Sequence, residues 1–395
     1  MNQNEKLLKE ADRCVKCGIC LPHCPTYTLT REEGDSPRGR ISLIQGIASG
    51  ALKGEQGKQH LDRCLGCLAC QSACPSAVNY SQLIDGIRLK QRKPPLQRIV
   101  RQLITHAPYR RWSRIALWLY RFSGLRPLLR LLGSHRLRRL DALLPVPPRV
   151  GNWKHLYQPA AAHRGRVGLF TGCAGRLIDR TALDAAIAVL THLGYAVVIP
   201  KNQGCCGAMH QHSGEPHKAE TMTLGNQQAF AEQNLEAIIY LASGCGAQLM
   251  QHPLAAPLFE ISQFLNRCDW PDSAKLSPLD YAVSLHTPCT LRHQIKAADE
   301  PAELLRRIPG IRLTLLDQIQ CCGAAGSYLQ EQPDMADALA NRAMQQVREQ
   351  SPRILATSNS GCALQFASSI RQAGLPIRSM HPIELINESL NGGKQ

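Results

Sequence analysis

The 395-residue sequence lacks the fingerprints of the common nucleotide-binding and hydrolase folds. It has no GxGxxG dinucleotide motif, no phosphate-binding P-loop and no GxSxG elbow. Because hydride transfer from an organic substrate relies on a flavin or a nicotinamide, we expect neither FAD nor NAD in this chain. We therefore expect a partner subunit to carry out any two-electron chemistry on an organic molecule.

Long apolar runs are also missing. No stretch approaches the eighteen or so uninterrupted apolar residues of a membrane-spanning helix, and the N-terminal MNQNEKLLKEADRC has no apolar core of a secretory signal. The 17 cysteines are odd in number and fall mostly in ligand-like spacings rather than in a disulfide framework. These features favour a reducing compartment, so we expect a cytoplasmic protein that is at most peripheral on the inner face of the cell membrane.

Acidic residues are scarce in residues 90–150, which hold 15 Lys or Arg and only Asp141, and so carry +14 of the net charge of +16. Arginines alternate there with apolar and aromatic side chains, including Trp112 and Trp118. A basic amphipathic helix of this kind is typical of a membrane surface or an acidic partner. A linker helix that packs on its own protein fits the same pattern. No nucleic acid is expected, because no recognised binding module accompanies the charge.

The cysteines that are present form one CxxCxxCxxxCP run twice, with the second copy 50 positions after the first. This is the spacing of bacterial ferredoxins with two [4Fe–4S] clusters, in which the fourth cysteine of each run ligates the other cluster. Structural zinc is the weaker alternative, since its CxxC pairs are usually separated by a longer loop. The predicted ligand sets are Cys14, Cys17, Cys20 and Cys74 for one cluster, and Cys64, Cys67, Cys70 and Cys24 for the other.

A second duplication follows in the C-terminal part of the chain. Its four cysteines per copy recur at offsets of 116, 116 and 117 residues, which indicates two copies of one unit. Apolar runs that alternate with helical patterns predict parallel strands with helical crossovers. The two sets are Cys173, Cys205, Cys206 and Cys245, and Cys289, Cys321, Cys322 and Cys362.

The predicted fold is an α-helical dicluster ferredoxin domain followed by a duplicated α/β pair with parallel sheets. The expected domains are 1–90, a basic helical connector at 91–150, a first α/β unit at 151–275 and a second at 276–395. The predicted strands are 166–170, 196–199, 237–241, 281–285, 313–316 and 353–357, and the first unit's predicted helices are 179–193 and 215–235. Every strand runs into a cysteine, so the thiols are expected at the sheet edge where open α/β sheets bind ligands.

The C-terminal cysteines have three interpretations. They are ligands of further iron–sulfur clusters, redox-active dithiols or buried core thiols. The metal interpretation is favoured because packing alone rarely repeats a four-thiol set at strand ends. Cys268 matches neither repeat and is expected to be an ordinary thiol.

Several sequence blocks carry a family resemblance: SPRGRISLI, HLDRCLGC, CPSAVNY, GCCGA, ASGCGA, HTPCTLRH and CCGAAGSY. They resemble the iron–sulfur subunits of membrane-associated 2-hydroxyacid and glycerol-3-phosphate dehydrogenases, most closely those of glycolate oxidase, in the CCG-domain family. The CCG units are also similar to those of heterodisulfide reductase. The wider family ends each unit with CxxC, whereas Gln248 and Gln365 stand at the last position here, which leaves four thiols rather than five.

The resemblance implies an electron-transfer subunit that serves the oxidation of glycolate to glyoxylate. FAD-binding oxidase subunits would deliver electrons, two [4Fe–4S] clusters and further clusters at the CCG units would carry them, and a membrane quinone would accept them. The alternatives are the equivalent subunit of a D-lactate or glycerol-3-phosphate dehydrogenase and, in a different class, a nucleic-acid-binding iron–sulfur protein.

Overall fold

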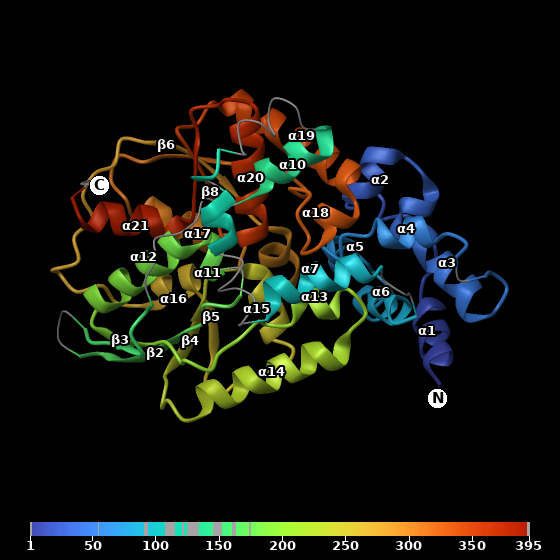
Figure 1. Cartoon of the computed structure of the whole chain (residues 1–395), viewed down its shortest axis with the longest axis horizontal. Coiled ribbons are helices and arrows are strands. Elements are labelled where there is room, and N and C mark those ends of the chain that lie inside the picture. Colours follow the sequence, from blue (N-terminus) through green and yellow to red (C-terminus); the bar gives the residue numbers. More distant parts are fainter. Residues whose placement is uncertain are drawn as a thin grey trace.

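The computed structural model describes residues 2–53, 55–90, 94–106, 115–120, 122–124, 134–144, 152–159, 163–173 and 175–392. A helical N-terminal body lies at one end of the molecule, and two α/β units form the rest (Figure 1). This arrangement confirms the predicted fold class. The connector helices lie across the α/β units rather than apart from them.

The N-terminal body is built from short helices around an apolar centre. Leu7, Ile44, Leu61 and Leu83 are fully buried in it. Helix α3 starts at Pro37 because the Ser36 hydroxyl accepts the Gly39 amide at 2.9 Å and proline suits a first helical position. The elements are α1 Gln3–Ala11, α2 Pro25–Thr30, the 3₁₀ turn η1 Glu33–Asp35, α3 Pro37–Ala48, α4 Lys58–Asp62, α5 Ala69–Ser72 and α6 Tyr80–Arg88.

The first α/β unit holds a five-stranded sheet of order β1-β3-β2-β4-β5, in which only β1 is antiparallel to its neighbour. The three predicted strands are confirmed to within one residue. The predicted helix 215–235 ends earlier, at Ala231, and Asn234 just beyond it takes a left-handed conformation (φ 47°). The elements are β1 Leu156–Tyr157, β2 Gly165–Leu169, α11 Gly175–Ile178, α12 Arg180–His192, β3 Tyr195–Val198, α13 Ala208–Gln211, α14 Pro216–Ala231, β4 Ala237–Tyr240, α15 Ser243–Leu249, β5 Leu258–Glu260 and α16 Ile261–Arg267.

The second unit repeats the parallel part of the first. Its sheet has the order β7-β6-β8-β9, which matches β3-β2-β4-β5, and all its pairings are parallel. Its three predicted strands are confirmed as well. The elements are β6 Ala282–His286, the π-helical turn η2 Leu291–Ile295, α17 Glu300–Arg306, β7 Arg312–Leu315, α18 Tyr328–Glu331, α19 Pro333–Gln350, β8 Ile354–Thr357, α20 Ser360–Gln372, β9 Arg378–Met380 and α21 Pro382–Leu390.

The two units share one hydrophobic core. Leu190 and Val197 of the first unit and Leu285 and Ile386 of the second belong to the same buried cluster. Helix α12 packs against α21 across the boundary. This shared core therefore fixes the position of one sheet relative to the other, and with it the positions of the two sheet edges that carry the cysteines.

The connector contributes α7 Pro95–Thr105 and α10 His135–Leu143, and residues 115–120 are helical too. Arg101 of α7 pairs with Glu215 of the first unit at 3.1 Å, and Arg139 of α10 pairs with Asp337 of the second at 2.7 Å. Trp112 lies outside the described residues, whereas Trp118 is half exposed. Part of the basic connector is thus tied to its own protein.

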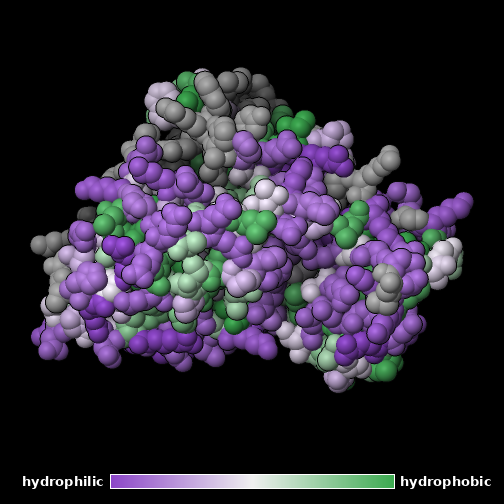
Figure 2. Space-filling view, turned by 90° about the horizontal axis from the view of Figure 1, so that it is seen from below, coloured by the Kyte–Doolittle hydropathy of each residue, from purple (hydrophilic) through white to green (hydrophobic). Residues whose placement is uncertain are grey.

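None of the described helices combines the length and apolar composition required to cross a bilayer. The face in Figure 2 is mostly hydrophilic, with hydrophobic residues in small groups among the polar ones.

Candidate cluster-binding sites

The two N-terminal cysteine runs meet at two neighbouring hollows. One, called the first hollow here, is lined by Cys14, Cys17, Cys20 and Cys74. The other, the second hollow, is lined by Cys24, Cys64, Cys67 and Cys70, and Cys70 also borders the first. The first hollow thus has the four cysteines of one predicted set together with Cys70, and the second has the four of the other set. Four thiolates around one hollow are the donor set that iron–sulfur clusters take.

The two hollows differ in their access to solvent. Cys17 at the first hollow is exposed, and its neighbours Val15 and Ile19 are 70% and 49% exposed. Cys24 and Cys64 at the second hollow are buried. The first hollow therefore faces the surface, and the second faces the protein interior.

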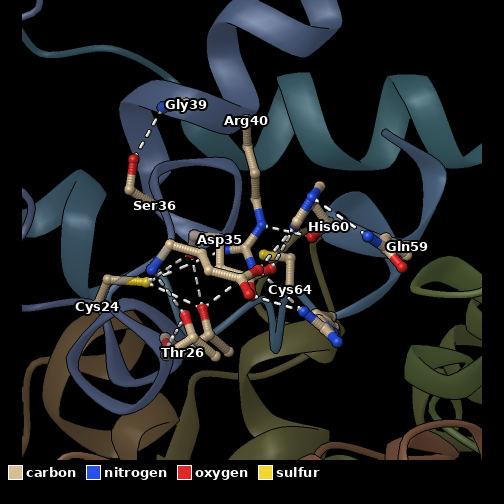
Figure 3. Close-up of polar contacts among 12 residues, drawn as sticks. Cys24, Thr26, Asp35, Ser36, Gly39, Arg40, Gln59, His60 and Cys64 are labelled. Carbon is tan, nitrogen blue, oxygen red and sulfur yellow. Dashed lines mark hydrogen bonds and ion pairs between the residues drawn. The ribbon is translucent and has the colours of Figure 1, made fainter. Parts of the chain in front are cut away.

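A buried charged network borders the second hollow (Figure 3). The Arg40 guanidinium donates to His60 O at 2.6 Å and to Thr26 Oγ1 at 3.0 Å, and its Nη1 lies 3.8 Å from Cys24 Sγ. Asp35, which is 0% exposed, is its carboxylate partner at 3.5 Å. Burial alone would lower the pKa of Arg40, but the thiols of Cys64 and Cys24, the Tyr80 phenol and Asp35 together raise it.

In the first α/β unit the four thiols converge beyond the carboxyl ends of β2, β3 and β4. Cys173 Sγ donates to Cys205 Sγ at 3.3 Å, and Cys206 shares hydrogen bonds with both Cys205 and Cys245. The Gly207 amide donates to Cys205 Sγ at 3.4 Å. This glycine is left-handed (φ 93°), and a Cβ on it would lie 2.9 Å from the backbone of α14, so only glycine fits here.

The second unit repeats this geometry. Cys322 Sγ donates to Cys362 Sγ at 2.9 Å, and the Gly323 amide donates to Cys321 Sγ at 3.3 Å. Cys289 and Cys321 are also hydrogen-bonded to each other. Each copy therefore brings its four predicted cysteines to one place at the sheet edge.

The second hollow adjoins the thiols of the second α/β unit. Burial raises the pKa of the Cys67 thiol well above its usual range, and the next cause is the neighbouring Cys289. Two hydrogen bonds fix this contact: Tyr328 OH donates to Arg63 O at 2.9 Å, and Gln320 Nε2 donates to Pro22 O at 2.7 Å. Two thiol clusters from distant parts of the sequence thus lie side by side.

Histidines near the cysteines serve as scaffolding. His210 is held between Glu215 at 2.8 Å and Thr105 at 3.1 Å. His286 bonds Thr357 at 3.0 Å, and burial lowers its pKa to about 3. Cys268 donates to Phe264 O at 3.1 Å and does not join a cysteine set.

Sequence reasoning missed the charged groups at the second hollow. Arg40 and Asp35 stand in the turn-rich GDSPRGR stretch, where charged residues normally face solvent. It also missed that Gln248 and Gln365 are each only 3% exposed. The sequence shows that the two glutamines occupy the same position in the two repeats, but it does not show that they are buried.

Comparison with known proteins agrees with this geometry. The family model described as a 4Fe-4S dicluster domain matches residues 10–78. The model described as a cysteine-rich domain (CCG) matches residues 167–250 and 283–367. The dicluster and cysteine-rich domains make this chain an iron–sulfur protein.

Relatives match over nearly the whole chain. A probable glycolate oxidase iron-sulfur subunit of Bacillus subtilis is 31% identical, over 95% of this chain and 93% of its own length. The glycolate oxidase iron-sulfur subunit of Escherichia coli is 32% identical, over 99% and 97%. A subunit of the dihydromethanophenazine:CoB–CoM heterodisulfide reductase of Methanosarcina acetivorans is 24% identical, over 90% and 88%. The chain belongs to the family of glycolate oxidase iron–sulfur subunits, and it is an electron-transfer component of an oxidoreductase.

Proposed function

We propose that this chain relays electrons in a flavin-dependent glycolate dehydrogenase, from an FAD-binding subunit toward a membrane quinone. The observation that carries the proposal is the convergence of the crossed cysteine sets on two hollows, the second of which abuts the thiols of an α/β unit. The near full-length likeness to glycolate oxidase subunits supports glycolate as the substrate.

The cysteines act as ligands in this proposal. Iron–sulfur clusters supply one-electron transfer at the potentials that their surroundings set. Cys14, Cys17, Cys20 and Cys74 hold one [4Fe–4S] cluster, and Cys24, Cys64, Cys67 and Cys70 hold the other. The residues fit these groups, because each hollow is lined by all four thiols of its set. The eight CCG cysteines hold further clusters, four thiols to each α/β unit.

Two exposed surface regions support a site for each step of the proposal. The exposed rim of the first hollow, with Val15 and Ile19, is where an FAD-binding subunit docks. The half-exposed Trp118 and Phe122 of the connector, 52% and 67% exposed, face the inner surface of the cell membrane. A basic segment beside such side chains favours anionic lipid.

Metal analysis and reconstitution test the proposal. Anaerobically purified chain should hold at least about eight irons for two [4Fe–4S] clusters, and more if the CCG units are loaded. Co-expressed with FAD-binding subunits, it should be reduced by glycolate and reoxidised by a quinone analogue. Faster reduction by D-lactate or glycerol 3-phosphate would assign another substrate. Fewer than about eight irons, or no reduction by any of these compounds, would refute the relay.

A further inference from the structure

The two hollows differ in the positive charge that surrounds them. Four arginines are buried among the described residues, and two of these, Arg40 and Arg88, stand at the second hollow. Arg40 contacts Cys24 Sγ through Nη1, and Arg88 donates to Cys64 O at 2.6 Å. The first hollow is lined instead by Arg38.

Arg38 and Arg40 stand two residues apart in α3 but have opposite surroundings. The Arg38 side chain is 33% exposed and pairs with Glu33 at 2.7 Å, so solvent and a carboxylate screen its charge. The Arg40 side chain is 1% exposed. Its partner Asp35 is shared, because Asp35 also accepts from Arg63 at 2.9 Å, closer than the 3.5 Å to Arg40.

The Arg40 guanidinium therefore directs its Nη1 at the Cys24 thiol. Its Nη1 faces Cys24, while its Nε and Nη2 are taken up by His60 O, Thr26 and Asp35. Figure 3 shows the side chain reaching from α3 into the space between Cys24 and Cys64. A buried cation stabilises added negative charge nearby, and a hydrogen bond to a cluster sulfur does so too.

We propose that Arg40 raises the reduction potential at the second hollow above that at the first, and so directs electrons inward. The inference rests on the relay proposed above. One electron leaves the first hollow and one arrives at the second, with no proton transferred, and the partner's reduced flavin is the source. Cys67 lies within electrostatic reach of the Cys289 thiol, and Tyr328 OH and Gln320 Nε2 join the two parts of the chain there, so the favoured step leads toward the second α/β unit.

The expected size follows from Coulomb's law. A unit charge about 6 Å from the added electron, at an effective dielectric constant of about 20, changes the equilibrium constant for reduction about a hundredfold. At 59 mV per factor of ten, this is a shift of about 120 mV in a one-electron midpoint potential.

The test is an anaerobic redox titration of the full chain, followed by electron paramagnetic resonance. In the wild type the two ferredoxin-type clusters should have separate midpoint potentials. Arg40→Met should lower the higher one by about 120 mV and leave the lower one in place. Arg40→Lys keeps the charge and should retain most of the difference, and Arg38→Met is the matched control with a small effect.

Several outcomes would overturn the inference. Equal midpoint potentials in the wild type would do so without any variant. The inference would also be overturned if the Arg40→Met variant kept its iron and its higher midpoint potential did not change. A shift in Arg38→Met as large as that in Arg40→Met would overturn it too. Fewer than about eight irons in the wild type would instead overturn the underlying relay, which keeps the two failures distinct.

Each CCG unit ends its cysteine motif with a buried glutamine. Gln248 and Gln365 are each 3% exposed, and in both the side-chain Oε1 is buried with no hydrogen-bond partner in the described residues. A buried acceptor left without a donor is destabilising. Its recurrence at one position of two repeats points to a ligand rather than to a packing defect.

The helices place each glutamine on the same face as a cysteine of its unit. Gln248 lies three residues after Cys245 in α15, and Gln365 lies three after Cys362 in α20, so each pair shares one helix face. We infer that the Gln248 and Gln365 amide oxygens are oxygen donors to iron held by the CCG cysteines. Because a neutral amide replaces a thiolate, the ligand set carries one negative charge fewer.

Substituting both glutamines by Glu or by Leu distinguishes an iron ligand from a side chain that only fills space in the core. Gln248→Leu combined with Gln365→Leu should lose or alter the Mössbauer and paramagnetic signals beyond the two ferredoxin-type clusters, whereas Glu at both positions should keep the iron. Gln372→Leu, at the exposed end of α20, is the control. An unaltered signal in the double Leu variant overturns the donor role. A wild type with only about eight irons overturns the CCG clusters themselves.

Discussion

Replacing Asp35 by Asn should weaken the N-terminal body far more than the same change at a surface ion pair. Asp35 is 0% exposed and accepts from Arg63 at 2.9 Å and from Arg40 at 3.5 Å, with His60 Nδ1 at 3.0 Å. Asparagine keeps the shape but removes the negative charge, which leaves the buried Arg40 guanidinium without its counter-ion.

The expected cost is about 3–5 kcal/mol, the range for removing one partner of a buried ion pair. At 1.36 kcal/mol per factor of ten, the local opening equilibrium should rise about 150- to 5000-fold. Native-state hydrogen exchange of peptides within residues 24–66 measures this directly, because local opening limits the exchange of protected amides. Iron is measured on the same samples, so that cluster loss is seen separately.

Asp280→Asn is the matched control. Asp280 and its partner Arg312 have side chains that are 84% and 65% exposed, and such pairs contribute at most about 1 kcal/mol. The Asp35→Asn, Arg40→Met double variant should regain part of the protection, because an uncharged pair avoids the unpaired buried charge. Equal protection in Asp35→Asn and Asp280→Asn would refute the reasoning.

Two further predictions concern the α/β units. Burial raises the pKa of Asp179 to about 7, from 3.8 in the unfolded chain, so the folded state favours its neutral form. Stability therefore falls as pH rises from 3.8 to about 7 and levels off above that. Asp179→Asn should remove this loss. The free energy of unfolding of the variant relative to wild type should therefore rise by about 2 kcal/mol between pH 5.5 and 8.5, as measured by paired urea titrations. A difference between the two proteins that does not change with pH would contradict the raised pKa of Asp179. Gly323→Ala would put a Cβ 2.4 Å from Ala336 O and should lower the iron content, whereas Gly374→Ala, equally left-handed but with open space around it, should keep it.

The sequence predicted what depends on local patterns. The strands at 166–170 and 353–357 were predictable because each is a short apolar run that ends in small residues and a cysteine. The strands β1, β5 and β9 were not, because two or three residues carry too little periodicity. The crossed grouping of thiols followed from the repeated spacing alone.

The contacts between distant segments could not be predicted in this way. Nothing in the motif around Cys67 indicates that Cys289 lies beside it, since the docking depends on hydrogen bonds such as that from Tyr328 to Arg63 O. Likewise, a charged Arg40 is expected at the surface until the packing of α3 against the second hollow is known.

The two α/β units are alike in fold but unequal in position. The N-terminal body reaches the second unit beside the thiols, where Cys67 neighbours Cys289. It reaches the first unit through polar groups instead, where Gln211 donates to Asp85 at 3.3 Å and His212 lies 3.8 Å from it. A gene duplication made the two thiol sites equivalent in sequence, but the docking of the N-terminal body places Cys67 near Cys289 of the second. If both sites hold iron, the second is therefore the one that exchanges electrons with the ferredoxin-type clusters first.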